Sequence, residues 1–465
     1  MDLENVRELA VDMLLEITGK GSYSHLVIRD VLDKYDYMEA RDKAFLKRLT
    51  EGTLERMIQI DYILDQFSKV PVSKMKPFIR NLLRLGVYQL FFMDSVPDSA
   101  VCNEAVKLAA KRGFGSLRGF VNGLLRNIAR NKKSVSWPVQ EDDLALWLSV
   151  TYSMPRYLVE KFLSERGREQ TQNMLESFLI PAPVTIRVKE TLDPCERKKL
   201  LAGLAKAGAV LTPHPYHASA FTLVGAEGVR SLPGFAEGLF TVQDVSSMLV
   251  CEAADIRPGD RVIDVCASPG GKALHAAEKA GAEGFVSARD LTEYKAGLIR
   301  DNSRRMGLLN MEVLVWDAAG LRSADIESAD VVLADLPCSG LGVIGKKKDI
   351  KYHASPEGLA QLAELQRKIL GTVWRYVKPG GVLLYSTCTV SRTENEENVA
   401  WFLENYPFEA ESLSPFLPGE LSADGESGML QLVPGTHKTD GFFIARLRRK
   451  KEPCSVQGKR TQECV

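Results

Sequence analysis

The spacing of apolar residues changes along the chain, and this change limits the folds available to it. Over the first 130 or so residues, apolar side chains recur every three or four positions, as at Leu82, Leu83, Val87 and Leu90. This spacing indicates amphipathic helices. From about residue 240, short runs rich in Val, Ile and Leu alternate with helical segments. That alternation predicts a parallel, doubly wound sheet.

Individual strands and helices can be predicted from these runs. The apolar segments expected to form the sheet are 261–265, 284–288, 311–316, 330–334, 382–385 and 442–447. Between the helical part and this sheet, the alternation at Val184–Val188 indicates a strand and the segment 197–207 a helix. A small α+β region is therefore expected there.

A chain of 465 residues is too long for one hydrophobic core, so we predict several domains. The polar stretch Lys132–Pro138 carries no period and ends in proline, which favours a linker. The predicted segments are an all-α domain (1–133), a linker (134–150), an α+β region (151–238), an α/β Rossmann-like domain (239–450) and a basic, disordered tail (451–465).

Charge is balanced overall but not locally. Sixty basic residues offset 60 acidic ones, so a polyanionic partner has to be met by a local patch. The segment from Arg80 to Lys133 carries ten basic residues against three acidic ones. This excess predicts contacts with nucleic acid phosphates.

The cysteines and histidines do not indicate a metal site. None of the eight cysteines forms a Cys-x-x-Cys pair, which argues against a zinc ribbon or a disulfide framework. His214 and His217 lie in a proline-rich loop without acidic or thiol neighbours, so we expect no metal there. The N-terminus lacks a leader pattern and no apolar run reaches about 18 residues. We expect a cytoplasmic, soluble monomer that does not contact membranes.

A loop rich in small residues follows the first strand of the predicted sheet. It opens a helix at 273–280 and has the composition of a nucleotide-binding turn: Cys266, Ala267, Ser268, Pro269, Gly270, Gly271 and Lys272. It is neither a Walker loop nor a dinucleotide fingerprint. Asp290, at the end of the second strand, is placed to bind ribose hydroxyls. Adenosine recognition without a pyrophosphate fits S-adenosylmethionine.

Acidic residues end four successive strands of the predicted sheet. They are Asp264, Asp290, Asp317 and Asp335. A single aspartate at a strand end is commonly a turn or helix cap. Four on the edge where ligands bind favour a common site.

Two cysteines follow neighbouring strands of the same sheet. Cys338 lies in Asp-Leu-Pro-Cys and Cys388 in Ser-Thr-Cys, whereas Cys102, Cys195 and Cys251 read as small buried hydrophobes. A thiolate that adds to carbon 6 of a pyrimidine makes carbon 5 nucleophilic toward a sulfonium methyl group. The roles of nucleophile, acid near N3 and base near carbon 5 suit Cys388, Asp335 and Cys338 in that order.

These segments resemble a known family. DVCASPGGK, DLPCSG and STCT, followed by Glu394-Asn395, are similar to the RNA cytosine-5 methyltransferases, and segments such as LRLGVYQL and FVNGLLR resemble the NusB RNA-binding fold. Their combination is similar to bacterial enzymes that act on 16S ribosomal RNA. The resemblance covers nearly the whole chain.

The resemblance implies roles for several residues. It makes Cys388 the nucleophile, assigns product release to Cys338, and places S-adenosylmethionine against residues 266–272 and the acids Asp290, Asp317 and Asp335. Residues 243–247 match a segment that closes the cofactor site. Gly345–Asp349 departs from an arginine-rich stretch of the family, which weakens planar phosphate recognition in substrate docking. Two alternatives stay open: Cys338 as nucleophile, on DNA or another RNA, and a non-enzymatic RNA-binding adaptor.

Overall fold

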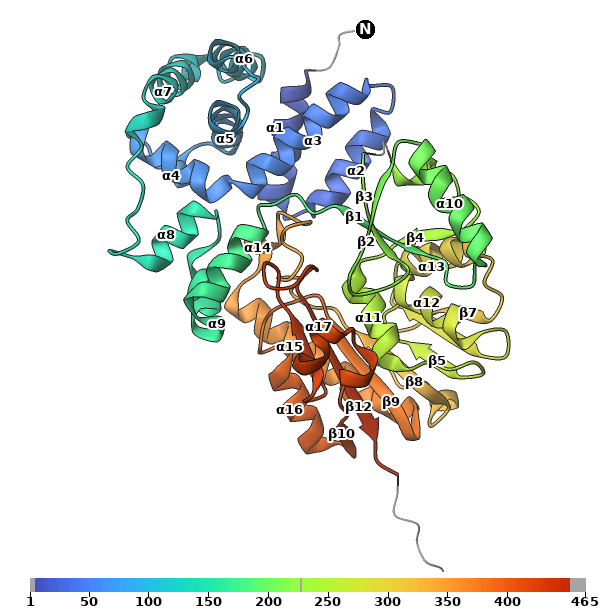
Figure 1. Ribbon diagram of the computed structural model, residues 1–465. Helices are drawn as coiled ribbons and strands as arrows, with labels where there is room; N and C mark the ends of the chain where they lie inside the picture. Colours follow the sequence, from blue (N-terminus) through green and yellow to red (C-terminus); the bar gives the residue numbers. More distant parts are fainter. Residues whose placement is uncertain (1–4, 226–227, 452–465) are drawn as a thin grey trace, which may run out of the picture. The chain divides into compact units, whose positions relative to one another are not determined.

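The computed structural model describes residues 5–225 and 228–451, and the chain divides into two compact units (Figure 1). The helical unit contains Met1–Ala182 together with Leu341–Ser355 and Pro434–Lys438, and the sheet unit contains Pro183–Gly340, Pro356–Val433 and Thr439–Val465. The predicted tail at 452–465 lies outside the described residues. No helix in the described ranges has the length and apolar character needed to cross a bilayer.

The helical unit confirms the helical spacing of the first 130 residues. Its helices are α1 (Val6–Lys20), α2 (Ser24–Lys34), α3 (Ala40–Glu55), α4 (Met57–Phe67), α5 (Pro77–Phe92), α6 (Asp98–Lys111), α7 (Arg118–Arg130), α8 (Leu144–Thr151), α9 (Arg156–Ser177) and α14 (Ile350–His353), with 3-10 turns at Val72–Lys74, Gly115–Leu117 and Lys132–Ser134. Helix α5 lies at the centre, because its apolar residues Leu82, Leu83 and Val87 are almost fully buried and it packs against α1, α3, α4, α6 and α7. A kink interrupts α9 at Gly167, whose φ of 75° suits glycine.

Two predicted boundaries differ from the structure. The segment 134–150, predicted as a linker, contains most of helix α8, which Asp143 caps by accepting a hydrogen bond from the Leu146 amide. The predicted α+β region at 151–238 is divided, because α9 belongs to the helical unit and the small sheet also uses residues beyond 238.

The small sheet lies within the sheet unit and is antiparallel, with strand order β2-β3-β1-β4. Its elements are β1 (Val184–Val188), α10 (Pro194–Lys206), β2 (Val210–Pro213), β3 (Ala220–Val224), a 3-10 turn at Val229–Ser231 and β4 (Phe240–Val242). Ile186 and Val188 pack with Leu200 and Leu204 of α10 in one core. The predicted strand 184–188 and the helix near 197–207 are thus confirmed.

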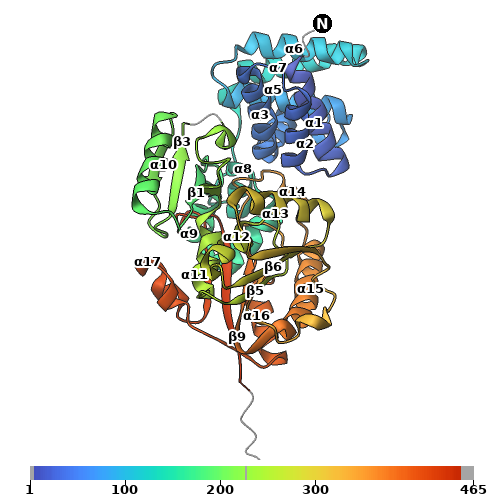
Figure 2. The same cartoon turned by 90° about the vertical axis from the view of Figure 1, so that its right-hand side faces the viewer.

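The main sheet has eight strands in the order β10-β12-β9-β8-β5-β6-β7, with β11 paired to β12. Figure 1 shows β7, β5, β8, β9, β12 and β10 in succession, and Figure 2 shows β5, β6 and β9 from another side. The strands are β5 (Arg261–Asp264), β6 (Phe285–Asp290), β7 (Met311–Val315), β8 (Ala329–Asp335), β9 (Val377–Thr387), β10 (Phe408–Ala410), β11 (Met429–Leu432) and β12 (Phe442–Arg449). The helices and 3-10 turns are α11 (Val245–Ala254), α12 (Gly271–Ala280), α13 (Glu293–Met306), α15 (Pro356–Val373), α16 (Glu396–Asn405), α17 (Gly419–Ser422), Ser323–Asp325, Trp374–Tyr376, Ser414–Phe416 and Ala423–Gly425.

Helices cover both faces of this sheet, as the alternation of strands and helices predicts. Val262 packs with α11 and α12 on one face, while its neighbour Ile263 packs with α15 and α16 on the other. Strands β5 to β9 are parallel.

The parallel arrangement predicted for the sheet is confirmed for β5 to β9 but does not extend to the C-terminal strands. Strands β10, β11 and β12 are antiparallel to their neighbours. The chain passes from β11 to β12 through a short loop instead of a crossover helix, and such a connection joins antiparallel strands.

Candidate active site

The acidic residues meet at one edge of the sheet. Asp264, Asp290 and Asp335 are the last residues of β5, β6 and β8, and Asp317 comes two residues after β7. Because these strands are parallel and adjacent, their carboxyl ends lie at the same edge. The predicted grouping of the four acids at one edge is confirmed.

The small-residue loop joins β5 to helix α12 and borders a cavity of about 200 Å³. Gly270 is the N-cap of α12 with a φ of 116°, a conformation that favours glycine. The cavity is lined by Val242, Gln243, Asp244, Ser247, Asp264, Cys266, Ala267, Ser268, Pro269, Gly271, Lys272 and Asp335. Most predicted cofactor residues, and several from the segment expected to close the site, therefore surround one cavity.

Asp290 and Asp317 do not line this cavity. Asp290 accepts hydrogen bonds from the backbone amides of Ser268 (3.0 Å) and Leu291 (2.8 Å), and Lys295 lies 3.2 Å from its carboxylate. Asp317 is exposed and accepts a hydrogen bond from the Ala319 amide at 2.9 Å. In this structure Asp290 holds the cofactor loop in place through Ser268.

Asp264 lies beneath the cofactor loop. Its side chain is fully buried, one carboxylate oxygen accepts from the Cys266 amide at 3.3 Å, and the other has no hydrogen-bond partner. Burial, together with the nearby charge of Asp335, raises the pKa of Asp264 to about 7.

Lys272 and Asp335 form an ion pair in the cavity wall. Lys272 Nζ donates to Asp335 Oδ2 at 2.7 Å and to Ser247 Oγ at 3.2 Å, and Ser386 Oγ donates to Asp335 Oδ1 at 2.8 Å. This charged pair links the first turn of α12 to the ends of β8 and β9.

The two predicted catalytic thiols are brought together. The Sγ atoms of Cys338 and Cys388 lie 3.3 Å apart, and both side chains are half-buried. Strands β8 and β9 are paired in parallel with Asp335 opposite Ser386, so the loops that follow them start side by side. The predicted convergence of these cysteines is confirmed.

Opposite charges flank the two thiols. The hydrogen bond with Cys388 raises the pKa of Cys338 well above its usual value, and partial burial and the Glu394 carboxylate add to this effect. The charge of Lys272, in contrast, interacts favourably with Cys388. The raised pKa of Cys338 favours its protonated thiol, whereas the charge of Lys272 favours a negative charge on Cys388.

Glu394 was not predicted as a functional residue. Its fully buried carboxylate accepts hydrogen bonds from the Ser339 amide (2.9 Å), Ser339 Oγ (2.5 Å) and Gln366 Nε2 (3.0 Å). It thereby fixes the residue next to Cys338. The sequence signal was the Glu394-Asn395 pair after the Ser-Thr-Cys segment, which indicated the family but no role.

Cys195 does not fit its prediction. Cys102 and Cys251 are buried as expected, but Cys195 is exposed because it lies in the first turn of α10 at the surface.

The segment 345–349 belongs to the helical unit, where Lys348 and Asp349 are held by other side chains while Lys346 and Lys347 are exposed. Lys348 pairs with Glu55, and Asp349 accepts hydrogen bonds from the amide (2.9 Å) and hydroxyl (2.5 Å) of Ser24. These contacts give the lysine and the acid structural roles, so they do not support the expected part of this segment in phosphate recognition.

Half of the ten basic residues at 80–133 are in ion pairs. Arg84 is buried against Asp61, and four other cations, Lys107, Lys111, Arg112 and Lys132, are in ion pairs. Exposed arginines remain on α7 at positions 118, 126 and 130.

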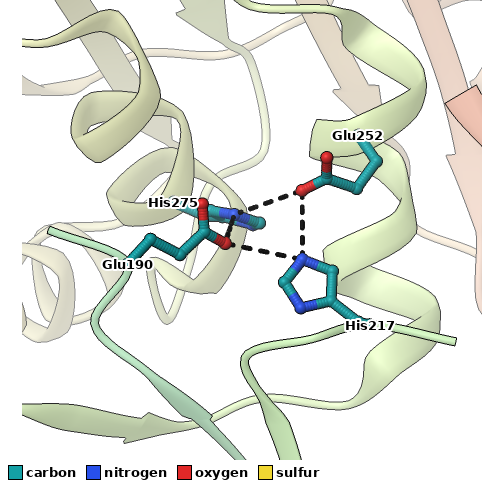
Figure 3. Close-up of side chains that lie close together, drawn as sticks. All are labelled: Glu190, His217, Glu252 and His275. Carbon is teal, nitrogen blue, oxygen red and sulfur yellow. Dashed lines mark hydrogen bonds and ion pairs between the residues drawn. The ribbon is translucent and has the colours of Figure 1, made fainter. Parts of the chain in front are cut away.

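The prediction that His217 has no acidic neighbours is wrong. His217 Nε2 lies 3.0 Å from Glu252 Oε1 and 3.4 Å from Glu190 Oε1, and His275 joins the same cluster (Figure 3). These acids are distant in sequence, so the proline-rich loop gave no sign of them.

The sheet, the loop at the end of its first parallel strand, and the paired thiols define an S-adenosylmethionine-dependent RNA methyltransferase. Residues 252–448 match the family model described as 16S rRNA methyltransferase RsmB/F. Residues 4–130 match the NusB family, and residues 154–230 match the RsmF/B-like ferredoxin-like domain.

Named relatives match nearly the whole chain. A probable ribosomal RNA small subunit methyltransferase B of Bacillus subtilis (strain 168) is 36% identical over 97% of this chain and 100% of its own length. Ribosomal RNA small subunit methyltransferase B of Klebsiella pneumoniae is 31% identical over 96% of this chain and 99% of its own length. The chain belongs to this family of small-subunit ribosomal RNA methyltransferases.

Solved structures agree in fold. The crystal structure of PH0851 has a TM-score of 0.79 and 26% identity, and the alignment covers 96% of this chain and 99% of that one. A methyltransferase homolog protein from Pyrococcus horikoshii has a TM-score of 0.56 and 28% identity, over 66% of this chain and 99% of that one.

Proposed function

We propose that this enzyme methylates carbon 5 of a specific cytosine in 16S ribosomal RNA through a covalent bond between Cys388 and carbon 6. The observation that carries the proposal is the 3.3 Å separation of two thiols beside the cofactor loop. The names of the relatives support 16S ribosomal RNA as the substrate, and the match to the NusB family supports binding of RNA.

The first step is addition of the Cys388 thiolate to carbon 6, which makes carbon 5 nucleophilic. Lys272 favours the thiolate at Cys388, and Asp335, which is paired with Lys272 at the end of β8, is our candidate for the hydrogen bond to the N3 edge of the base. S-adenosylmethionine, when bound by the loop 266–272 and Asp290, supplies the methyl group that carbon 5 attacks. The target base has to leave its stack to reach Cys388, which favours an unpaired or distorted RNA site.

Release requires removal of the carbon 5 proton and loss of the Cys388–C6 bond. Bonding of Cys388 to carbon 6 removes the hydrogen bond and the charge that raise the pKa of Cys338. Cys338 then gives its own proton to solvent more readily, and its thiolate accepts the proton from carbon 5. The electron pair of that C–H bond re-forms the C5–C6 double bond, and Cys388 departs as a thiolate. This order uses Cys338 as base only after the adduct exists.

The test is capture of the adduct on small-subunit RNA that contains 5-fluorocytosine, located by tandem mass spectrometry. We expect the adduct on Cys388, no product or adduct with Cys388→Ala, and a persistent adduct on normal RNA with Cys338→Ala. The exposed Cys195→Ala is the matched control and should leave activity unchanged. An adduct on Cys338 would reverse the assignment, and a protein that binds no S-adenosylmethionine would favour an adaptor role.

A further inference from the structure

Four side chains from separate elements of the sheet unit converge on one point (Figure 3). They are Glu190, His217, Glu252 and His275. Glu190 follows β1, His217 precedes β3, Glu252 lies on α11 and His275 on α12. One potential ligand atom from each lies within 4.8 Å of every other.

The distances within the cluster suit a tetrahedral ion. His275 Nε2 lies 2.9 Å from Glu190 Oε1 and 3.7 Å from Glu252 Oε1, and His217 Nε2 lies 3.4 and 3.0 Å from the same two oxygens. Zinc bonds of about 2.0–2.2 Å place tetrahedral donor atoms about 3.3–3.6 Å apart. Each imidazole nitrogen thus faces both carboxylates, at separations close to those of a shared coordination sphere.

We propose that this cluster binds a divalent transition metal ion of the zinc class. Two imidazoles and two carboxylates are a ligand set that zinc accepts, and four protein ligands make a closed structural site. A surface cavity of about 500 Å³, lined in part by Glu190, His217 and Glu252, gives the ion a route from solvent. The function proposed above does not depend on this site.

Without a metal, the same side chains form a hydrogen-bonded cluster. The metal-bound and the hydrogen-bonded states differ in the position of the proton on His217. The Ser219 amide donates to His217 Nδ1 at 3.1 Å, which leaves the proton of a neutral His217 on Nε2. Lys279 Nζ lies 2.7 Å from Glu252 Oε1 and supplies a positive charge. When a metal binds Nε2, the His217 proton moves to Nδ1. Nδ1 can then no longer accept the hydrogen bond from Ser219, so His217 cannot be in both states at once.

The bound ion would connect the small sheet to the helices of the methyltransferase domain. His275 lies three residues after Lys272, in the second turn of the helix that starts at the cofactor loop. Anchoring His275 to Glu190 and His217 would therefore brace the end of the loop against the small sheet. The role is structural, because all four positions of a tetrahedral site are filled by protein.

The test uses full-length protein freed of metal by chelation, to which Zn²⁺ alone or Co²⁺ alone is added. We expect one equivalent of Zn²⁺ to bind, and Co²⁺ to give the visible absorption of a tetrahedral site without the thiolate charge-transfer band. Glu190→Gln and His217→Ala should each weaken Zn²⁺ binding by roughly 10- to 100-fold or more. His214→Ala, in the same loop but outside the cluster, is the matched control.

Two further measurements on the unmodified protein test the proposal even if a variant folds poorly. Zn²⁺ should raise the thermal unfolding temperature of the unmodified protein, and nitrogen NMR should show the His217 proton moving from Nε2 to Nδ1. Absence of one-equivalent binding would overturn the proposal and leave the hydrogen-bonded cluster. Binding that survives in both ligand variants, or a cobalt–thiolate band, would also overturn it by assigning the metal to cysteines.

Discussion

Cys338 and Cys388 share a hydrogen bond of 3.3 Å between sulfurs, yet they meet charges of opposite sign, an anion beside Cys338 and a cation beside Cys388. Distance alone would let either sulfur serve as nucleophile. The charges distinguish them, because a thiolate is stabilised near a cation and disfavoured near an anion. The assignment of Cys388 as nucleophile therefore depends on Lys272 and Glu394 as much as on the sulfurs.

Glu394→Ala is expected to destabilise the protein and to impair release more than adduct formation. The change leaves the Ser339 amide without this acceptor and removes one of the two acceptors of the Gln366 side-chain amide, which still donates to the Pro337 carbonyl, at a cost of about 1–3 kcal/mol for a donor left unpaired. Urea denaturation measures the stability, and the lifetime of the trapped adduct measures release. The exposed Glu397→Ala, three residues later, is the control. Equal stability of the two variants would contradict the anchoring role.

Asp264→Asn is expected to remove part of the pH dependence of stability. The pKa of Asp264 is raised from 3.8 to about 7 in the folded state, so between these values the folded state holds a proton that the unfolded state has lost. Stability from this group is therefore present below about pH 4 and is lost as the pH rises toward about 7. Asparagine cannot ionise, so the free energy of unfolding of the variant should not show this decrease between about pH 4 and pH 7.

The measurement is the free energy of unfolding from urea denaturation between pH 4 and pH 8 for both proteins. The variant should gain stability relative to the unmodified protein as the pH rises. Parallel curves would show that Asp264 is ionised in the folded state throughout this range.

Asp290→Ala is expected to weaken binding of S-adenosylmethionine by about 1.5–3 kcal/mol, the value of hydrogen bonds to a charged group. Two effects combine, because Asp290 is proposed to bind ribose and also holds the Ser268 amide at 3.0 Å. Calorimetry gives the dissociation constant, and thermal unfolding without cofactor reports the loop contact separately. An unchanged dissociation constant would remove Asp290 from the cofactor site.

The sequence predicted the features that depend on local pattern and strand order. Asp335, Cys338 and Cys388 come together because the strands before them are adjacent and parallel, and alternating strands and helices imply such a sheet. Partners far apart in sequence leave no such pattern. Glu394 reaches back to Ser339 across 55 positions, and Arg112 pairs with Asp12 across 100. The antiparallel C-terminal strands likewise depend on a loop whose path the apolar spacing does not specify.

Replacement of Arg118, Arg126 and Arg130 on α7 by glutamine is expected to weaken RNA binding and to reduce its dependence on salt. These arginines are exposed, and they donate hydrogen bonds to neutral groups on or next to the same helix. Each phosphate contact on single-stranded RNA contributes roughly 0.7 to the slope of log affinity against log salt, so three lost contacts lower it by about 2.

The matched control replaces three cations that are already in ion pairs, Lys107, Lys111 and Arg112. Affinity is measured by fluorescence anisotropy at several salt concentrations. Because both triple variants change the net charge equally, an identical loss of slope in the two would indicate a general charge effect and would exclude α7 as the RNA-binding helix.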